Sequence, residues 1–151
     1  SNARKIKTTS KRLEDQTATW LETSHDMYKP QYGVEVHRRL YIHHNGADLR
    51  GEEIIMPSNM ADGAVMPFAF RLHLHPNVKA SMVGRGNTIL LALPNGEGWQ
   101  FSALGEATQL TLDKSVYMGQ NGAPRQCQQI VLEGHAASSD MTLKWGLKLM
   151  S

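Results

Sequence analysis

Hydrophobic and polar residues alternate with a period of two along most of this chain. The clearest stretch is 141–149, where every second residue is apolar and the residues between are Thr, Lys or Gly. Residues 68–74 repeat the pattern, with Phe and Leu at one set of positions and Ala, Arg and His at the other. Because successive side chains of a β-strand point to opposite faces, both stretches predict strands with one face buried in a core.

The same alternation, more weakly, predicts further short strands at residues 17–22, 34–42, 53–56, 78–83, 88–93, 99–103, 109–112, 116–118 and 128–132. Asn95-Gly96 lies between two of these segments, and Asn-Gly adopts the positive φ values that tight hairpins need. Asn45-Gly46 and Asn121-Gly122 are weaker signals of this kind, and Gly84-Arg85-Gly86 marks another hairpin tip. About ten or eleven short strands at hairpin spacing predict an all-β, antiparallel sandwich.

The length and composition fit one globular domain. The chain has 151 residues, of which 40% are hydrophobic and 20% charged. Ser1-Asn2-Ala3 resembles the scar of a cleaved expression tag, and residues 4–16 are polar and basic. We therefore assign 1–3 to a tag and 4–16 to a lead-in segment, and we expect the domain to occupy 17–151.

Charge and cysteine content exclude several classes of partner and site. A net charge of +2 gives no reason to expect nucleic acid or a membrane surface as a partner. No stretch approaches the roughly 20 apolar residues of a membrane-spanning helix. Cys127 is the single cysteine, so we exclude an internal disulfide and expect a small buried hydrophobic residue.

Several phrases carry a resemblance to a known family. In chain order they are WLETSHDMY (20–28), HRRLY (37–41), DLRGEE (48–53), FRLHLHPNVKA (70–80), PNGEGW (94–99), SVYMG (115–119) and PRQCQQIVL (124–132). In this order and spacing they resemble the C-terminal β-sandwich domain of bacterial heparinase II/III-like proteins, which are polysaccharide lyases. The resemblance extends from about Ala18 to Leu149.

The resemblance implies a division of labour within a longer parent protein. Such proteins join an N-terminal helical toroid to the sandwich and cleave acidic, uronate-containing polysaccharides by β-elimination. The reaction needs a group that neutralises the uronate carboxylate, a base that removes the adjacent proton and an acid that protonates the leaving oxygen. In the family, the Tyr and His residues for these roles lie mainly in the toroid and at its junction with the sheet.

The family's metal site also uses His-x-His-x-Asp and His-Asn-Thr phrases, and neither occurs in this sequence. The resemblance therefore implies no catalytic residue in this fragment, and zinc only in the parent protein. It implies an acidic polysaccharide and the toroid as partners, and a location in the periplasm or cell envelope. Whether the fragment is itself an enzyme stays open.

His73-Leu74-His75 is the one motif suited to a metal. Two histidines at i and i+2 of a strand point the same way, about 6.5–7 Å apart, which suits two ligands of one zinc or iron ion. A third ligand does not follow at a suitable distance, and the next histidine, His135, is predicted to lie in a loop. The alternative is a polar outer face that includes Arg71.

Four residues are candidates for contact with an acidic polysaccharide. His37 and Arg39 share one face of a predicted strand, and Arg71 and His73 share a face of another. Guanidinium groups bind carboxylates and sulfates in a two-pronged geometry, and histidine adds a donor that depends on pH. The alternative is a solvated face or an interface to the toroid.

Other conspicuous residues have structural interpretations. Trp20, Trp99 and Trp145 stand at alternating positions typical of a core, and we favour packing over sugar stacking. Asp26 beside His25 is predicted to be a turn residue. Three functions remain compatible with the sequence: a lyase domain that helps to form the cleft, a glycan-binding module that does not cleave, and a purely structural docking domain.

Overall fold

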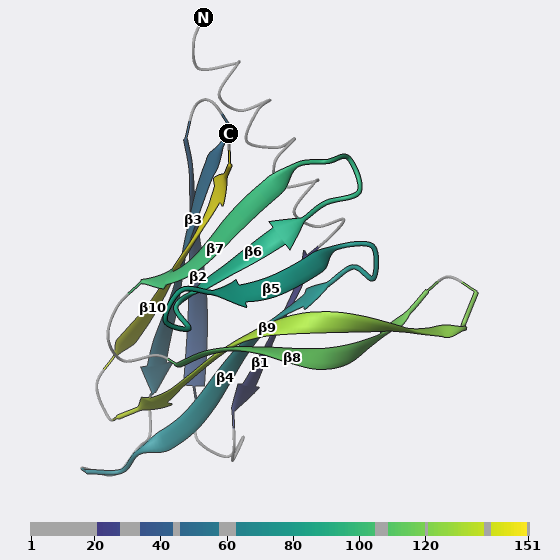
Figure 1. The fold of residues 1–151 in the computed structure, drawn as a ribbon. Coiled ribbons are helices and arrows are strands. Elements are labelled where there is room, and N and C mark those ends of the chain that lie inside the picture. Colours follow the sequence, from purple (N-terminus) through teal and green to yellow (C-terminus); the bar gives the residue numbers. More distant parts are fainter. Residues whose placement is uncertain are drawn as a thin grey trace, which may run out of the picture.

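The structure, a computed structural model, describes residues 21–27, 34–43, 46–57, 63–104, 109–119, 121–137 and 140–150. Every regular element within these ranges is a β-strand (Figure 1). The strands are β1 (Leu21–Met27), β2 (Val34–Ile42), β3 (Asp48–Pro57), β4 (Met66–Leu74), β5 (Lys79–Val83), β6 (Thr88–Ala92), β7 (Gly98–Leu104), β8 (Gln109–Met118), β9 (Pro124–Ala136) and β10 (Met141–Leu149).

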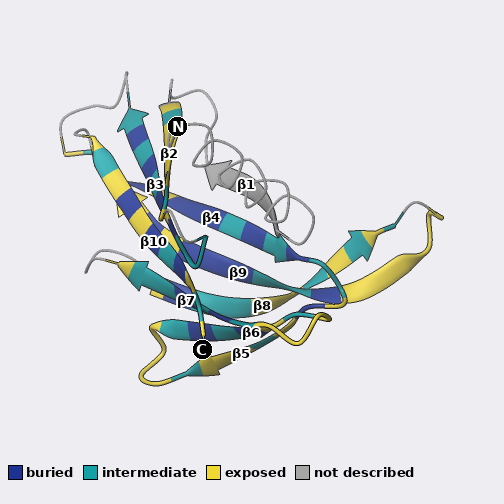
Figure 2. Cartoon of the chain, turned by 90° about the horizontal axis from the view of Figure 1, so that it is seen from above, coloured by how far each residue is buried: buried dark blue, intermediate teal, exposed yellow. Residues whose placement is uncertain are grey.

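The strands form two sheets in which every neighbouring pair is antiparallel. One sheet has four strands in the order β1-β4-β9-β8, and the other has six in the order β2-β3-β10-β7-β6-β5. The two sheets lie face to face, with their buried residues between them (Figure 2). The predicted all-β antiparallel sandwich is therefore confirmed. No helix in the described ranges is long and apolar enough to cross a membrane.

The core follows directly from the alternation in the sequence. In β4 and β10 the core-facing side chains alternate with more exposed ones, and these two strands lie inside their sheets rather than at an edge. Burying one face of each strand removes its apolar side chains from water while the other face stays polar. The largest fully buried side chains are Trp145, Phe70, Phe101, Ile55, Leu72, Leu74, Ile89, Leu91, Ile130, Leu132, Leu143 and Leu147.

The hairpins predicted at Asn95-Gly96 and Asn121-Gly122 are present, whereas Asn45 of the third signal lies outside the described residues. Gly96 has a φ of 88° and Gly122 has a φ of 69°, a region that side chains with a Cβ disfavour. The first turn joins β6 to β7, where Leu93 N donates to the Glu97 carbonyl at 2.9 Å. The second joins β8 to β9. This hairpin projects away from the body of the sandwich (Figures 1 and 2).

Three local predictions were wrong. Residues 109–112 and 116–118 belong to one strand, because β8 pairs with β9 along its whole length and the polar residues between stay extended. His25 and Asp26 lie inside β1 opposite Phe70 and Ala69, so they are not a turn. His135 lies inside β9 opposite Pro67 rather than in a loop. Residues 17–20 of the first predicted strand, and Trp20 with them, lie outside the described residues.

Candidate functional site

The predicted binding residues lie on the outer faces of different sheets. His37 and Arg39 are exposed on β2 of the six-stranded sheet. Arg71 and His73 lie on β4 of the four-stranded sheet, where they alternate with the buried side chains that face the core. The two outer faces of a sandwich point away from each other. The structure therefore does not bring the four residues into one site.

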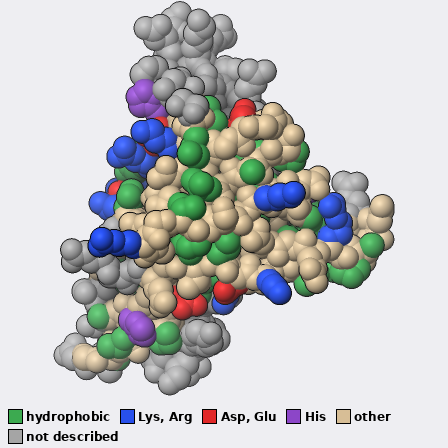
Figure 3. All heavy atoms as spheres, in the orientation of Figure 1, with side chains coloured by type: hydrophobic (Ala, Val, Ile, Leu, Met, Phe, Trp, Pro, Cys, Tyr) green, Lys and Arg blue, Asp and Glu red, His purple; other side chains and the backbone are tan. Residues whose placement is uncertain are grey.

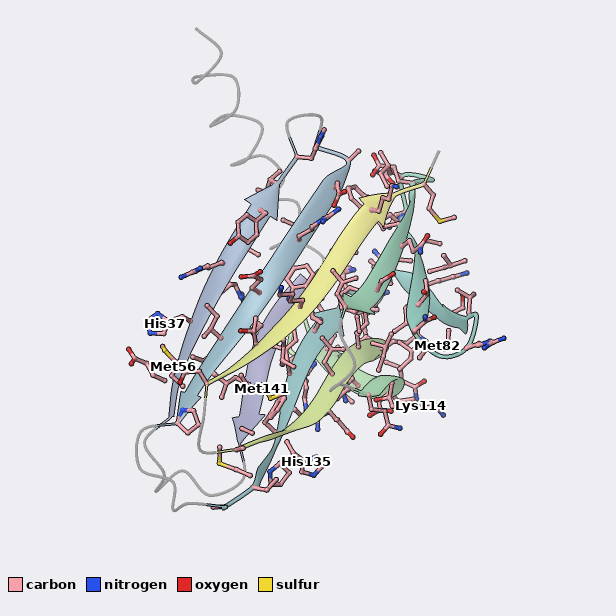
Figure 4. The ribbon with its side chains drawn as sticks, turned by 90° about the vertical axis from the view of Figure 1, so that its left-hand side faces the viewer. His37, Met56, Met82, Lys114, His135 and Met141 are labelled. Atoms are coloured by element: carbon pink, nitrogen blue, oxygen red, sulfur yellow. The ribbon has the colours of Figure 1, made fainter. Side chains whose placement is uncertain are left out.

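The β2 pair occupies the free edge of its sheet. His37 Nε2 lies 2.9 Å from Glu35 Oε1, and both side chains are largely exposed. Arg39 stands opposite Glu52 in the register of β2 and β3. Figure 4 looks onto this part of the molecule and shows His37 beside Met56 at the edge of β2. This is a solvated face of mixed charge.

The β4 histidines contact the β8–β9 hairpin. His73 Nδ1 lies 3.3 Å from Ser115 Oγ, and the ring of His75 lies 5.1 Å from that of Tyr117. The His75 Nδ1 atom accepts a hydrogen bond from the backbone of Asn77 at 3.1 Å. In the part of the chain that the structure describes, no three His, Cys, Asp or Glu side chains are placed to hold a metal ion. The described residues therefore do not fit a zinc or iron site at His73 and His75.

A buried ion pair is the feature that the sequence analysis missed. Glu53 of β3 is completely buried, and its Oε1 accepts a hydrogen bond from Arg38 Nε at 2.7 Å. Arg38 stands opposite Glu53 in the register, and its guanidinium lies 5.7 Å from the ring centre of Phe70. Burial raises the pKa of Glu53, while the charge and hydrogen bond of Arg38 and the indole of Trp145 lower it.

The alternation of inward and outward residues along β3 could have predicted this ion pair. Glu53 shares its face with Leu49, Gly51 and Ile55, all of which are buried. A glutamate at an inward position of a half-buried strand predicts a partner on the neighbouring strand. Arg38 is also offset by one residue from the exposed pair His37 and Arg39, so it points to the opposite face. Glu53 belongs to the core, and Arg38 reaches it from the edge strand β2 while its side chain stays partly exposed.

Gln128 of β9 connects the two sheets at the free edge of β5. Its Oε1 accepts a hydrogen bond from Ala80 N at 2.9 Å, and its Nε2 donates to the Ala80 carbonyl at 3.1 Å. The side chain thus takes the place of a neighbouring strand for one residue. This contact holds the β8–β9 hairpin beside β5.

An open groove of about 410 Å³ follows this contact. Its walls are the turn between β4 and β5 on one side and the arms of the hairpin on the other. Lys79 and Lys114 give it a positive character. The full lining is Pro76, Val78, Lys79, Lys114, Ser115, Val116, Gln126, Cys127 and Gln128.

A smaller hollow of about 220 Å³ lies on the outer face of the six-stranded sheet. It spans β3, β10 and β7, and its lining is Asp48, Arg50, Gln100, Ser102, Leu104, Gly146, Leu147 and Lys148. Figure 3 shows Lys and Arg side chains gathered along the left-hand margin of the molecule, where this sheet lies, with Asp and Glu among them. Figure 4 views the same sheet face on. The hollow combines cationic, amide and hydroxyl groups on rigid strands.

The comparisons with known proteins agree with this architecture. Residues 1–146 match the model of the family described as heparinase II/III-like, C-terminal. The chain belongs to the heparinase II/III-like C-terminal family. The match includes residues 1–16, and the domain boundary at residue 17 remains a prediction.

Two kinds of relative accompany the family match. The chain is 31% identical over 133 residues to the FtsZ-localized protein C of Caulobacter vibrioides, covering 84% of this chain and 22% of that protein. It also resembles the crystal structure of the heparan sulfate lyase HepC from Pedobacter heparinus, with a TM-score of 0.65 and 11% identity. A mutant of that lyase gives the same TM-score at 10% identity.

The length and identity of these matches limit what can be inferred from each of them. The alignment covers 87% of this chain and 20% of the lyase, so the chain spans about a fifth of the length of the proteins it matches. At 11% identity the likeness to the lyase concerns the fold alone. The heparinase II/III-like family and the sandwich fold are thus established, whereas activity needs a separate argument.

Proposed function

We propose that this chain is the β-sandwich domain of a heparinase II/III-like polysaccharide lyase, that it supports the cleft for an acidic polysaccharide, and that it does not cleave alone. The observation that carries the proposal is the family match over residues 1–146. The chain also has the fold of a sandwich that makes up about a fifth of a heparan sulfate lyase. The cleft's other wall and the catalytic groups belong, on this proposal, to an N-terminal toroid in the parent protein.

The polar outer faces support the binding part of this proposal. Arg50 and Lys148 line a hollow on the six-stranded sheet, and Lys79 of β5 and Lys114 of β8 line the groove where the edges of the two sheets meet. Cations on rigid strands attract polyanions through their charge and bind carboxylates and sulfates by charged hydrogen bonds. On this proposal the parent protein works in the periplasm or cell envelope, where such polysaccharides are accessible.

A cleavage assay tests the division of labour. β-Elimination leaves an unsaturated uronate at the new chain end, which absorbs in the ultraviolet. The isolated chain should give no product from heparan sulfate or other uronate-containing polysaccharides, while the full-length parent should cleave at least one of them. Product formed by the isolated chain would contradict the proposal.

A second candidate function rests on the closer sequence relative. The identity of 31% to the FtsZ-localized protein C is well above the 11% to the lyase. In this alternative the sandwich is a docking domain of a protein that localizes with FtsZ. The lyase fold would then serve binding alone, since a fold does not determine its function.

Co-sedimentation with FtsZ polymers separates the two candidates. Retention of the full-length parent on FtsZ polymers, together with no cleavage of any uronate polysaccharide, would favour the docking function. Cleavage without co-sedimentation would favour the lyase. The variant Arg50→Glu can be measured in both assays, because it changes the charge of the sandwich surface and leaves the core side chains as they are.

A further inference from the structure

The geometry points to the hollow above Gly146 as a subsite for one acidic sugar unit, with Arg50 and Lys148 binding its carboxylate or sulfate. This inference rests on the proposed function and names where the sandwich would contact the polysaccharide. It concerns the outer face of β3, β10 and β7, and it involves neither the histidines of β4 nor the groove beside β5.

Gly146 is surrounded by polar residues on its own strand and the two neighbouring strands. It stands between Arg50 of β3 and Ser102 of β7 in the two registers of β10. One pair further along the strand, Lys148 stands between Asp48 and Gln100. Directly opposed residues on one face of a sheet have Cβ atoms about 4.5–5.5 Å apart, so these groups surround the bare backbone of Gly146.

Packing does not require this glycine. A Cβ on Gly146 would find its nearest neighbour, Leu104 Cδ1, at 4.0 Å, which is ordinary van der Waals contact. Its φ is not among the positive values found at the turn glycines. Glycine weakens a strand interior, and it often marks the place where a ligand approaches the backbone. The missing side chain is what leaves the hollow open.

The charges of the lining suit an anion that also carries hydroxyl groups. Arg50 Nε lies 3.6 Å from Asp48 Oδ1, and the Arg50 side chain is 66% exposed. Lys148 is exposed and makes no ion pair with any described residue. The lining therefore holds two cations and one carboxylate. The Gln100 amide and the Ser102 hydroxyl add neutral donors and acceptors.

The size and composition favour a sugar over other anions. A volume of about 220 Å³ is below the roughly 300–1,000 Å³ typical of pockets for drug-sized ligands, so the hollow suits one ring of a longer chain. Its lining has no aromatic residue on which a nucleotide base could stack. Asp48, Gln100 and Ser102 offer the mixed donors and acceptors that ring hydroxyl groups need.

Titration of the isotope-labelled chain with defined fragments of heparan sulfate, chondroitin sulfate and alginate tests this subsite by NMR. At least one fragment should shift the amide signals of Gly146 and Ser102. Gly146→Thr fills the hollow from its floor with a residue that favours strands. Lys148→Glu reverses its free charge. Each should weaken binding about tenfold or more, the loss expected for one charged hydrogen bond.

Lys114→Glu tests the other groove directly. Arg85→Glu is the matched control, because it reverses a charge on the exposed turn between β5 and β6, which lines neither hollow, and it should alter affinity less than about twofold. Thermal unfolding should show that Gly146→Thr is folded. If that variant does not fold, Gly146→Ala changes the floor of the hollow with a smaller side chain, and Lys148→Glu changes its charge.

The outcomes separate this inference from the proposed function. Binding that survives Gly146→Thr and is lost in Lys114→Glu would overturn the subsite and move it to the groove. Binding of none of the fragments would also overturn it, while cleavage by the parent would leave the proposed function standing. Binding at Gly146 by a parent that cleaves nothing would uphold the subsite and contradict the lyase.

Discussion

Gly51 of β3 and Trp145 of β10 stand directly opposite each other, and a Cβ on Gly51 would overlap the indole ring of Trp145. The indole is almost completely buried and lies between the rings of Phe70 and Phe101, with centroid distances of 6.5 Å and 5.8 Å. The absent side chain at Gly51 is thus what lets this buried indole lie flat against its neighbouring strand.

Gly51→Ala should destabilise the fold. The added methyl group must displace the indole or the backbone, and overpacking of a well-packed core costs about 1–3 kcal/mol. Urea unfolding measures the loss. Gly146→Ala is the control on the partner strand, since its methyl group has room, and it should be neutral or stabilising by up to about 1 kcal/mol. Equal losses in both variants would contradict the packing argument.

Arg38→Met should destabilise the chain far more than Arg39→Met. Arg38 faces the buried Glu53, whereas Arg39 is exposed on the other face. Removing one partner of a buried pair costs about 3–5 kcal/mol, and solvent screening of the partly exposed Arg38 lowers our expectation to about 2 kcal/mol at neutral pH. Arg39→Met should stay within about 0.5 kcal/mol of the wild type in the same unfolding experiment.

Glu53→Gln should change how stability depends on pH. Burial raises the pKa of Glu53 above its ordinary value of 4.5, so the folded chain holds this proton more tightly than the unfolded one. The resulting stabilisation is complete below pH 4.5 and is lost as the pH rises through the folded pKa. The free energy of unfolding should therefore fall less steeply with rising pH in the variant. An unchanged slope would assign the pH dependence to other groups.

Gln128→Ala should loosen the junction between the sheets. It removes both hydrogen bonds to the backbone of Ala80, each worth about 0.5–1.5 kcal/mol. Hydrogen exchange at the Ala80 amide should accelerate, while the core amides of β10 keep their protection. Gln126→Ala, an exposed neighbour two residues away, is the matched change and should leave the Ala80 exchange rate as it is.

The sequence predicted the sandwich because alternation is a local signal. The boundaries of β2 and β10 match the predicted segments, and Trp99 and Trp145 are in the core as expected. The continuous β8 was missed because only its pairing with β9 reveals that Asp113 and Lys114 continue the strand. Asp26, which the sequence predicted to be a turn residue, is instead part of β1 because β1 pairs with β4.

The candidate site depended on information that no local pattern holds. His37 and Arg39 share an outward face, as do Arg71 and His73, and strand order decides that these faces belong to opposite sheets, while the predicted contact with polysaccharide stays a prediction. The hollow above Gly146 likewise requires the registers of β3, β10 and β7 together. These long-range pairings come from packing of the whole sandwich and are invisible in any one segment.

The central claim is that this sandwich binds polysaccharide while the chemistry belongs to the rest of the parent protein. Steady-state cleavage kinetics of the full-length parent carrying Gly146→Thr test it most directly. A substrate contact made equally before and during the reaction predicts a raised KM, by about tenfold, with kcat unchanged. A lowered kcat at unchanged KM would place Gly146 and its neighbours in the chemical step and contradict the account.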